Sequence, residues 1–109
     1  MRLNVGCGLS SWGDVRVDLK RGSANILADA QHLPFKDQSF QEVHCISVLE
    51  HISSWSQALN EMLRVTKGKV LIEVPVNSDI RKTDVFRLLL PTPKNIRLFF
   101  RPQLKRDSI

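Results

Sequence analysis

The sequence predicts an α/β fold built on an open, mostly parallel sheet of about five strands. Short runs of β-branched and aliphatic residues alternate with turns over the first two thirds of the chain. Only one segment shows strongly the apolar spacing of an amphipathic helix. Strands separated by helices or crossover connections favour parallel pairing. The 109 residues are enough for a single domain, 1–109.

The expected strands cover residues 3–5, 15–17, 26–28, 43–48 and 69–74. The fourth segment is almost continuously apolar, which predicts burial on both faces of the sheet. The fifth segment stops at Pro75, because proline has no N–H to donate to a ladder.

One helix is expected over residues 55–66. Apolar residues recur there at helical spacing, at Trp55, Ala58, Leu59, Met62 and Leu63. Ser54 and Gln57 have the spacing of a capping box, and Gly68 stands where a C-terminal cap belongs. We expect the apolar stripe of this helix, Leu59 and Met62 included, to pack on the sheet.

The last third of the chain predicts two shorter helices. One is expected after Asp84 and ends at Pro91. Thr92 followed by Pro93 predicts the start of the second, which Pro102 limits.

The first two connections are too short for helices. Six residues separate Gly8 from Val15, and seven separate Asp18 from Ile26. Seven extended residues span roughly 23 Å at about 3.3 Å each, enough to return along a short strand only as coil. We therefore expect one face of the sheet to lack its helices. Either the C-terminal segment or a second copy would cover this apolar face, and we favour a two-fold homodimer.

The charge of the chain is unevenly placed. The formal net charge is +5, and residues 1–76 hold eight basic and eight acidic residues. The whole excess therefore belongs to residues 77–109. This segment suggests an anionic partner, whereas the alternative is an ordinary solvated surface. A nucleic-acid partner is weakly supported, because aromatic stacking motifs are missing.

Composition excludes several classes of protein. Hydrophobic residues make up 42% and charged residues 25%, as in ordinary globular proteins. Two cysteines are too few for a disulfide framework, which favours a reduced, cytoplasmic protein. We find no secretory signal and no apolar run that would span a bilayer, and we expect no membrane partner.

Three strand ends carry residues suited to a nucleotide-like ligand. Gly6, Cys7 and Gly8 follow the first strand, and glycines allow a sharp turn close to a ligand. Asp18 ends the second strand and can accept both hydroxyls of a ribose, whereas Asp29 ends the third and can accept an amine. A plain turn and loop caps are the alternative for each. Together they indicate a ligand site at one edge of the sheet.

The order of the motifs resembles a known family. The segments are LNVGCG (3–8), VD (17–18), ADAQHLPF (28–35), DQSF (37–40), SVLEHI (47–52), EMLRV (61–65) and LIEVP (71–75). In this order they resemble the class I S-adenosylmethionine-dependent methyltransferases, and most closely the small type 11 members. The resemblance covers residues 2–76 strongly and residues 95–101 more weakly. It implies a Rossmann-like sheet, with residues 1–76 as the cofactor-binding core and 77–109 as a basic C-terminal segment.

The resemblance also implies a role for individual residues toward S-adenosylmethionine. The backbone of Gly6, Cys7 and Gly8 would line the methionine part of the cofactor. Asp18 would hold the ribose hydroxyls, and Leu19 would pack against the adenine face.

Four more residues complete the implied site. Asp29 would take the adenine amine, with the backbone of Ala30 nearby. Ser47 would border the methionine amino group, and His51 would lie near the transferred methyl. His51 is the candidate general base, and a structural histidine closing the strand is the alternative. The histidines and cysteines lack metal-ligand spacing, so no metal is expected.

The chain also departs from the family pattern. It has no room for a helix before the first strand, and it ends where the family continues into a helix and two further strands. Two function classes therefore stay open. The first is a small methyltransferase acting on an unidentified acceptor. The second is a non-catalytic relative that keeps the cofactor-binding fold and acts as a binding or regulatory protein.

Overall fold

A computed structural model describes residues 1–76, 78, 80–81, 84–85 and 95–101. Along the chain its elements are β1 (Arg2–Val5), β2 (Val15–Asp18), β3 (Ile26–Leu27), β4 (Phe40–Ile46), the 3-10 helix η1 (Leu49–His51), α1 (Trp55–Val65), β5 (Thr66–Pro75) and β6 (Asn95–Arg101). The five expected strands are all present, with ends that shift by up to three residues.

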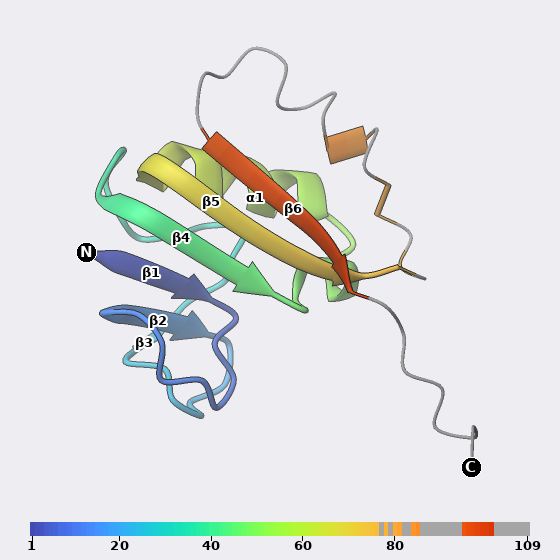
Figure 1. Cartoon of the computed structure of the whole chain (residues 1–109). Helices are drawn as coiled ribbons and strands as arrows, with labels where there is room; N and C mark the ends of the chain where they lie inside the picture. The colour runs from blue at the N-terminus through green and yellow to red at the C-terminus, as the bar shows by residue number, and fades with distance from the viewer. Residues whose placement is uncertain (77, 79, 82–83, 86–94, 102–109) are drawn as a thin grey trace.

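The strands form one open sheet in the order β3-β2-β1-β4-β5-β6. Every neighbouring pair is parallel, so the carboxyl ends of the strands meet at one edge (Figure 1). The predicted Rossmann-like, reduced α/β fold is confirmed, with six strands rather than about five.

The sixth strand corrects the prediction for the last third of the chain. The helix expected after Thr92 and Pro93 is wrong, because residues 95–101 form β6. This strand pairs with β5 from Lys69 opposite Asn95 to Pro75 opposite Arg101. The sequence Ile-Arg-Leu-Phe-Phe contains β-branched and aromatic residues that favour strands, and the helical interpretation overlooked this. At least one strand expected to be missing is therefore present, whereas the helix expected after Asp84 lies mostly outside the described residues.

The helix α1 confirms the predicted amphipathic stripe. It runs from Trp55 to Val65, and its residues Ala58, Leu59, Met62 and Val65 are buried. They belong to one hydrophobic core with Val43 and Cys45 of β4 and Val70, Ile72 and Val74 of β5. One face of the sheet is therefore covered by α1 (Figure 1).

Both predicted caps of α1 are wrong. The Ser54 side chain makes no capping hydrogen bond, and Gln57 Nε2 instead donates to the carbonyl of Gln31 at 3.3 Å. At the other end, β5 begins directly at Thr66, so Gly68 lies within the strand. A Cβ on Gly68 would lie 2.6 Å from the carbonyl oxygen of Gln41, so glycine here permits the close approach of β4.

The face of the sheet opposite α1 confirms one expectation and corrects another. Residues 6–14 and 19–25 contain no helix, as their lengths predict. The expectation that β4 is apolar on both faces is wrong, because Glu42 and His44 alternate with the buried Val43. Glu42 Oε1 lies 3.0 Å from His44 Nε2 and 3.5 Å from Lys69 Nζ on β5. Such a polar ladder suits a face that has no covering helix.

An aromatic contact covers the centre of this polar face. The Trp12 ring stacks on the His44 imidazole, with centroids 3.5 Å apart and an interplanar angle of 7°. Asn4 of β1 holds the Trp12 segment, because its Nδ2 donates to the carbonyl of Trp12 at 3.2 Å. The coil segment that carries Trp12 thus covers part of this face, where none of the described helices lies.

Candidate functional site

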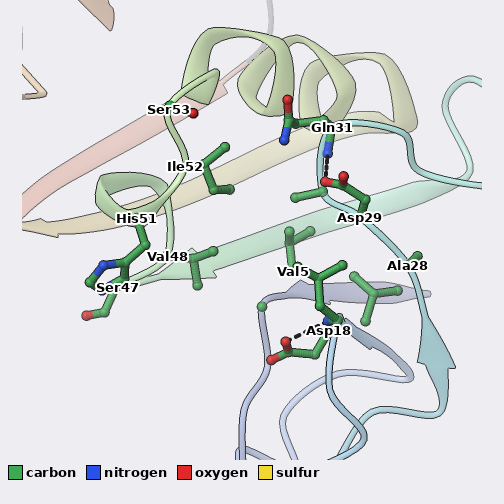
Figure 2. Close-up of a pocket in the computed structure, with 14 residues that line it drawn as sticks. Val5, Asp18, Ala28, Asp29, Gln31, Ser47, Val48, His51, Ile52 and Ser53 are labelled. Carbon is green, nitrogen blue, oxygen red and sulfur yellow. Dashed lines mark hydrogen bonds between the residues drawn. The ribbon is translucent and has the colours of Figure 1, made fainter.

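A cavity of about 460 Å³ opens at the carboxyl edge of the sheet. Small-molecule sites typically fall in this size range, and open α/β sheets bind ligands at this edge. The lining residues come from the ends of β1 and β2 and from the segments 28–31 and 47–53, the latter directly after β4 (Figure 2).

Seven of the nine predicted site residues line this cavity. They are Gly6, Asp18, Leu19, Asp29, Ala30, Ser47 and His51. Cys7 and Gly8 are not among the lining residues, although the turn to which they belong is. Sequence reasoning missed Val5, Val17, Ala28, Gln31, Val48, Ile52 and Ser53. Most of these flank a predicted residue, and their neutral side chains carry no signal in a motif.

The glycine turn after β1 packs tightly against the wall of the cavity. Gly6 has a φ of +70°, and a Cβ there would lie 2.3 Å from Cγ2 of Val48. The amides of Gly6 and Cys7 both donate to the carbonyl of Val17, at 2.9 and 3.1 Å. Any side chain at position 6 would therefore have to displace Val48 as well as adopt a strained backbone.

The carboxylate of Asp18 is fixed by the backbone around it. Its Oδ2 accepts from the Gly8 amide at 2.8 Å, and its Oδ1 accepts from the Leu19 amide at 2.7 Å. An ionised carboxylate has about four lone-pair sites, so capacity remains on the side of the cavity. Burial and the nearby Asp18 charge raise the pKa of the Cys7 thiol, which argues against a reactive thiol in this turn.

The loop after β2 rests on the glycine turn. The Ser23 amide donates to the carbonyl of Gly8 at 2.8 Å. Gly22 has a φ of +40°, and a Cβ there would lie 2.4 Å from the same carbonyl oxygen. Gly22 therefore allows a contact that fixes the turn from the side opposite to Asp18, and no sequence motif indicated it.

Asp29 is held in a turn of its own. Its Oδ1 accepts from the Gln31 amide at 2.9 Å, and its carbonyl accepts from the His32 amide at 3.0 Å. This local bonding is the pattern of an Asx turn, and it orients the carboxylate at the cavity (Figure 2).

Arg64 of α1 fastens the segment that follows Asp29. Its guanidinium donates to the carbonyls of Leu33 and Phe35 at 2.9 and 2.7 Å. It also forms a bidentate salt bridge with Glu61, at 2.6 and 3.1 Å. Glu61 in turn accepts a hydrogen bond from the Leu33 amide at 2.8 Å. The Arg64 hydrogen bonds hold the pKa of Glu61 below its usual range. The Asp29 side of the cavity is thereby tied to the core helix α1.

Ser47 and His51 lie at the other side of the cavity from Asp29 (Figure 2). Ser47 has a φ of +58°, uncommon for a residue other than glycine, and its amide donates to the carbonyl of Glu73 at 2.8 Å. The sharp bend there ends β4 at Ile46, earlier than expected, and turns the chain into η1.

The His51 side chain is 77% exposed, and its Nε2 lies 3.9 Å from Oε2 of Glu50. Glu50 is largely buried, and its charge adds to desolvation in raising the pKa of the buried Cys45 thiol to about 12. His51 thus offers an imidazole on its side of the cavity that solvent and a ligand can both reach.

Within the described part of the chain, no group of three histidine, cysteine or acidic side chains could hold a metal ion. No helix among the same residues is long and apolar enough to cross a membrane.

Comparison with known proteins decides the family. A family profile described as a methyltransferase domain matches residues 13–72, more than half of the chain. The chain is a member of the class I S-adenosylmethionine-dependent methyltransferases of the type 11 kind. The family supports methyl transfer in general, and its members generally bind S-adenosylmethionine.

Two relatives illustrate the extent of the match. An uncharacterized protein of Methanocaldococcus jannaschii is 34% identical over 122 residues, which cover 96% of this chain and 51% of the relative. A demethylmenaquinone methyltransferase of Thermobifida fusca is 39% identical over 71 residues, which cover 57% of this chain and 30% of the relative. The chain thus spans about half the length of the first relative and less of the second.

Proposed function

We propose that this methyltransferase domain binds S-adenosylmethionine in the carboxyl-edge cavity and transfers its methyl group to an acceptor nucleophile. The observation that carries the proposal is the convergence of Gly6, Asp18 and Asp29 on one cavity with His51 across from them. The ends of three consecutive strands, β1 to β3, supply the first three of these groups, as the family resemblance implies.

The donor and acceptor chemistry of the cavity fits the cofactor. The fixed Asp18 carboxylate would accept the two ribose hydroxyls, and Leu19 would cover one adenine face. Asp29 would accept the adenine amine, with the Ala30 backbone beside it. The turn from Gly6 to Gly8 and the bend at Ser47 would border the methionine portion. At Gly8 a Cβ position has nothing within 4 Å, which leaves open space for a ligand beside the backbone.

The proposed reaction asks little of the protein besides positioning. The bound cofactor supplies a sulfonium, which is an activated methyl donor. The carboxylates of Asp18 and Asp29 would fix the adenosine end, so that the methyl faces the His51 side of the cavity. His51 would take a proton from an acceptor that must lose one, and its exposure allows that proton to pass to solvent.

Calorimetric titration of S-adenosylhomocysteine into matched variants tests the assignment. Asp18→Ala should weaken binding by about 1.5–3 kcal/mol, the value of hydrogen bonds to a charged group. Asp14→Ala is the matched control, because Asp14 also accepts one backbone amide, from Arg2 at 2.9 Å, but lies outside the cavity. Equal affinities of the two variants would show that Asp18 does not contact the ligand.

A non-catalytic binding or regulatory protein is the second candidate function. The unusually short connection after the glycine turn favours it, because a full helix N-terminus would normally help to bind the methionine carboxylate. Saturable cofactor binding without methyl transfer to any offered acceptor would favour this alternative.

A further inference from the structure

The exposed apolar side chains of the described residues gather at one edge of the sheet. Seven large hydrophobic residues are between 36% and 87% exposed, and Met1 is the member at the amino edge. The other six form what we call the apolar rim: Leu9, Leu19, Leu27, Ile46, Val76 and Phe99. Five of them lie within two residues of the carboxyl ends of β2 to β6, and Leu9 lies in the loop that follows β1.

The positions of the rim residues follow from the strand ends. Leu19 and Val76 come directly after β2 and β5, whereas Leu27 and Ile46 are the last residues of β3 and β4. Phe99 lies level with Ile46, because both pair with Glu73 of the strand between them.

The rim borders the mouth of the candidate cofactor cavity. Leu19 lines that cavity, and Ile46 directly precedes the lining residue Ser47. The loop that carries Leu9 contacts the loop that carries Leu19, through the hydrogen bond from Ser23 to Gly8. Single exposed apolar residues are ordinary on protein surfaces, but a set drawn from successive strand ends along the edge that holds the cavity marks an interaction surface.

The exposed charges directly beside Leu19 are cationic. Lys20 and Arg21 follow Leu19 and are both exposed. Among the acidic side chains nearby, Asp18 is bonded to backbone amides and Glu50 is only 10% exposed. Glu73 is partly exposed and lies between Ile46 and Phe99, away from Leu19. Apolar tips beside exposed cations are the pattern of side chains that enter the interface of an anionic bilayer.

We propose that the apolar rim docks on the surface of an anionic lipid bilayer, with the cavity opening toward the lipid. A second copy of the chain is a poorer occupant, because it would bring another Lys20 and Arg21 toward the first pair. The sequence predicted no membrane partner, and the proposal departs from that expectation, because surface docking needs no spanning segment. If the proposed function holds, the acceptor is a molecule of the lipid phase.

Co-sedimentation of the full chain with vesicles tests the docking surface directly. Phosphatidylcholine vesicles with and without phosphatidylglycerol are the probes, and no cofactor is added. We expect binding to the anionic vesicles only. The double variant Leu9→Ser/Leu27→Ser should weaken it about tenfold, because two apolar contacts with the interface are lost. Both leucines are exposed and lie outside the cofactor cavity, so the fold should persist, which urea unfolding verifies.

Two double charge variants distinguish binding through the apolar rim from general attraction between a basic protein and anionic lipid. Lys20→Glu/Arg21→Glu changes the charge at the rim, whereas Lys36→Glu/Lys67→Glu makes the same change near the amino ends of β4 and β5. The first pair should weaken binding by at least about tenfold, at roughly fivefold per lost charge, and the second by far less.

Three results of the vesicle assay would overturn the proposal. They are an absence of vesicle binding, equal losses from the two charge pairs, and wild-type binding by the leucine variant. A lower mass of the leucine variant in light scattering would also overturn it, because a second copy would then be the occupant. The vesicle assay needs no cofactor, so its failure and a failure of cofactor binding are separate results.

Discussion

Replacing Arg64 with methionine should destabilise the domain by about 3 kcal/mol. The guanidinium makes five hydrogen bonds, to Glu61, Asp37, Leu33 and Phe35. The Asp37 contact is worth little, because that carboxylate is 75% exposed. The cost comes mainly from Glu61, whose side chain is 15% exposed and would lose its charged partner. Removing one member of a largely buried pair costs about 3–5 kcal/mol, and partial exposure of Arg64 places the value at the low end.

Urea unfolding monitored by circular dichroism measures this cost. With an m-value of about 2 kcal/mol/M, the midpoint should fall by about 1.5 M. Asp37→Ala is the matched control and should shift the midpoint by no more than about 0.5 M, from less than about 1 kcal/mol. Arg64→Lys keeps the charge but cannot reach both carbonyls and Glu61. Its urea midpoint should therefore lie between those of Arg64→Met and Asp37→Ala. A midpoint for Arg64→Met equal to that of Asp37→Ala would refute the reasoning.

The same cluster predicts a dependence on pH. Arg64 holds the pKa of Glu61 below its usual range in the folded chain. The stabilisation by this pair is therefore fully present above the unfolded-state pKa of glutamate, and it is lost as the pH falls through the lower folded-state value. The difference in stability between wild type and Arg64→Met should accordingly shrink on acidification below the ordinary range of glutamate.

Two further predictions concern the core and the oligomeric state. Leu59 is fully buried in the core beneath α1, so Leu59→Ala should cost about 2–5 kcal/mol, and an unchanged urea midpoint would contradict its place there. We also keep the prediction of a two-fold homodimer through the face opposite α1 or through the C-terminal segment, and a monomeric mass in light scattering at micromolar concentration would contradict it.

The parts of the fold that sequence could predict are those with a strong local pattern. The stripe of Leu59 and Met62 repeats at helical spacing, and it located α1 to within one residue. The five strands were found because β-branched runs end at Gly6, Asp18 and Pro75. The lengths of the first two connections were enough to exclude helices there, because chain reach is a matter of geometry.

The predictions that failed depend on contacts between residues that are far apart in the sequence. Gln57 bonds to Gln31 rather than to its own helix, and Gly68 is needed for the approach of β4. The polar face of β4 could be understood only once Lys69 was known to lie beside Glu42. The strand at residues 95–101 was mistaken for a helix because the prolines on either side suggested helix boundaries.

Much of the candidate site followed from the sequence, because most predicted residues stand at or just after a strand end. Parallel strands bring their carboxyl ends together, so Asp18 and Asp29 were expected near Gly6. The supporting contacts could not be predicted in this way. Gly22 and Arg64 contact backbone carbonyls of other segments, and no sequence motif predicts which carbonyls these are.

Titration of the wild-type chain with S-adenosylhomocysteine, followed by backbone amide NMR, tests the central claim most directly. The account predicts saturable shifts at Gly6, Leu19, Ala30 and Ser47, which line the cavity, and little change at Trp12 on the opposite face of the sheet. Absence of saturable shifts at millimolar ligand, or shifts centred on the Trp12 and His44 pair, would contradict a cofactor site at the carboxyl edge.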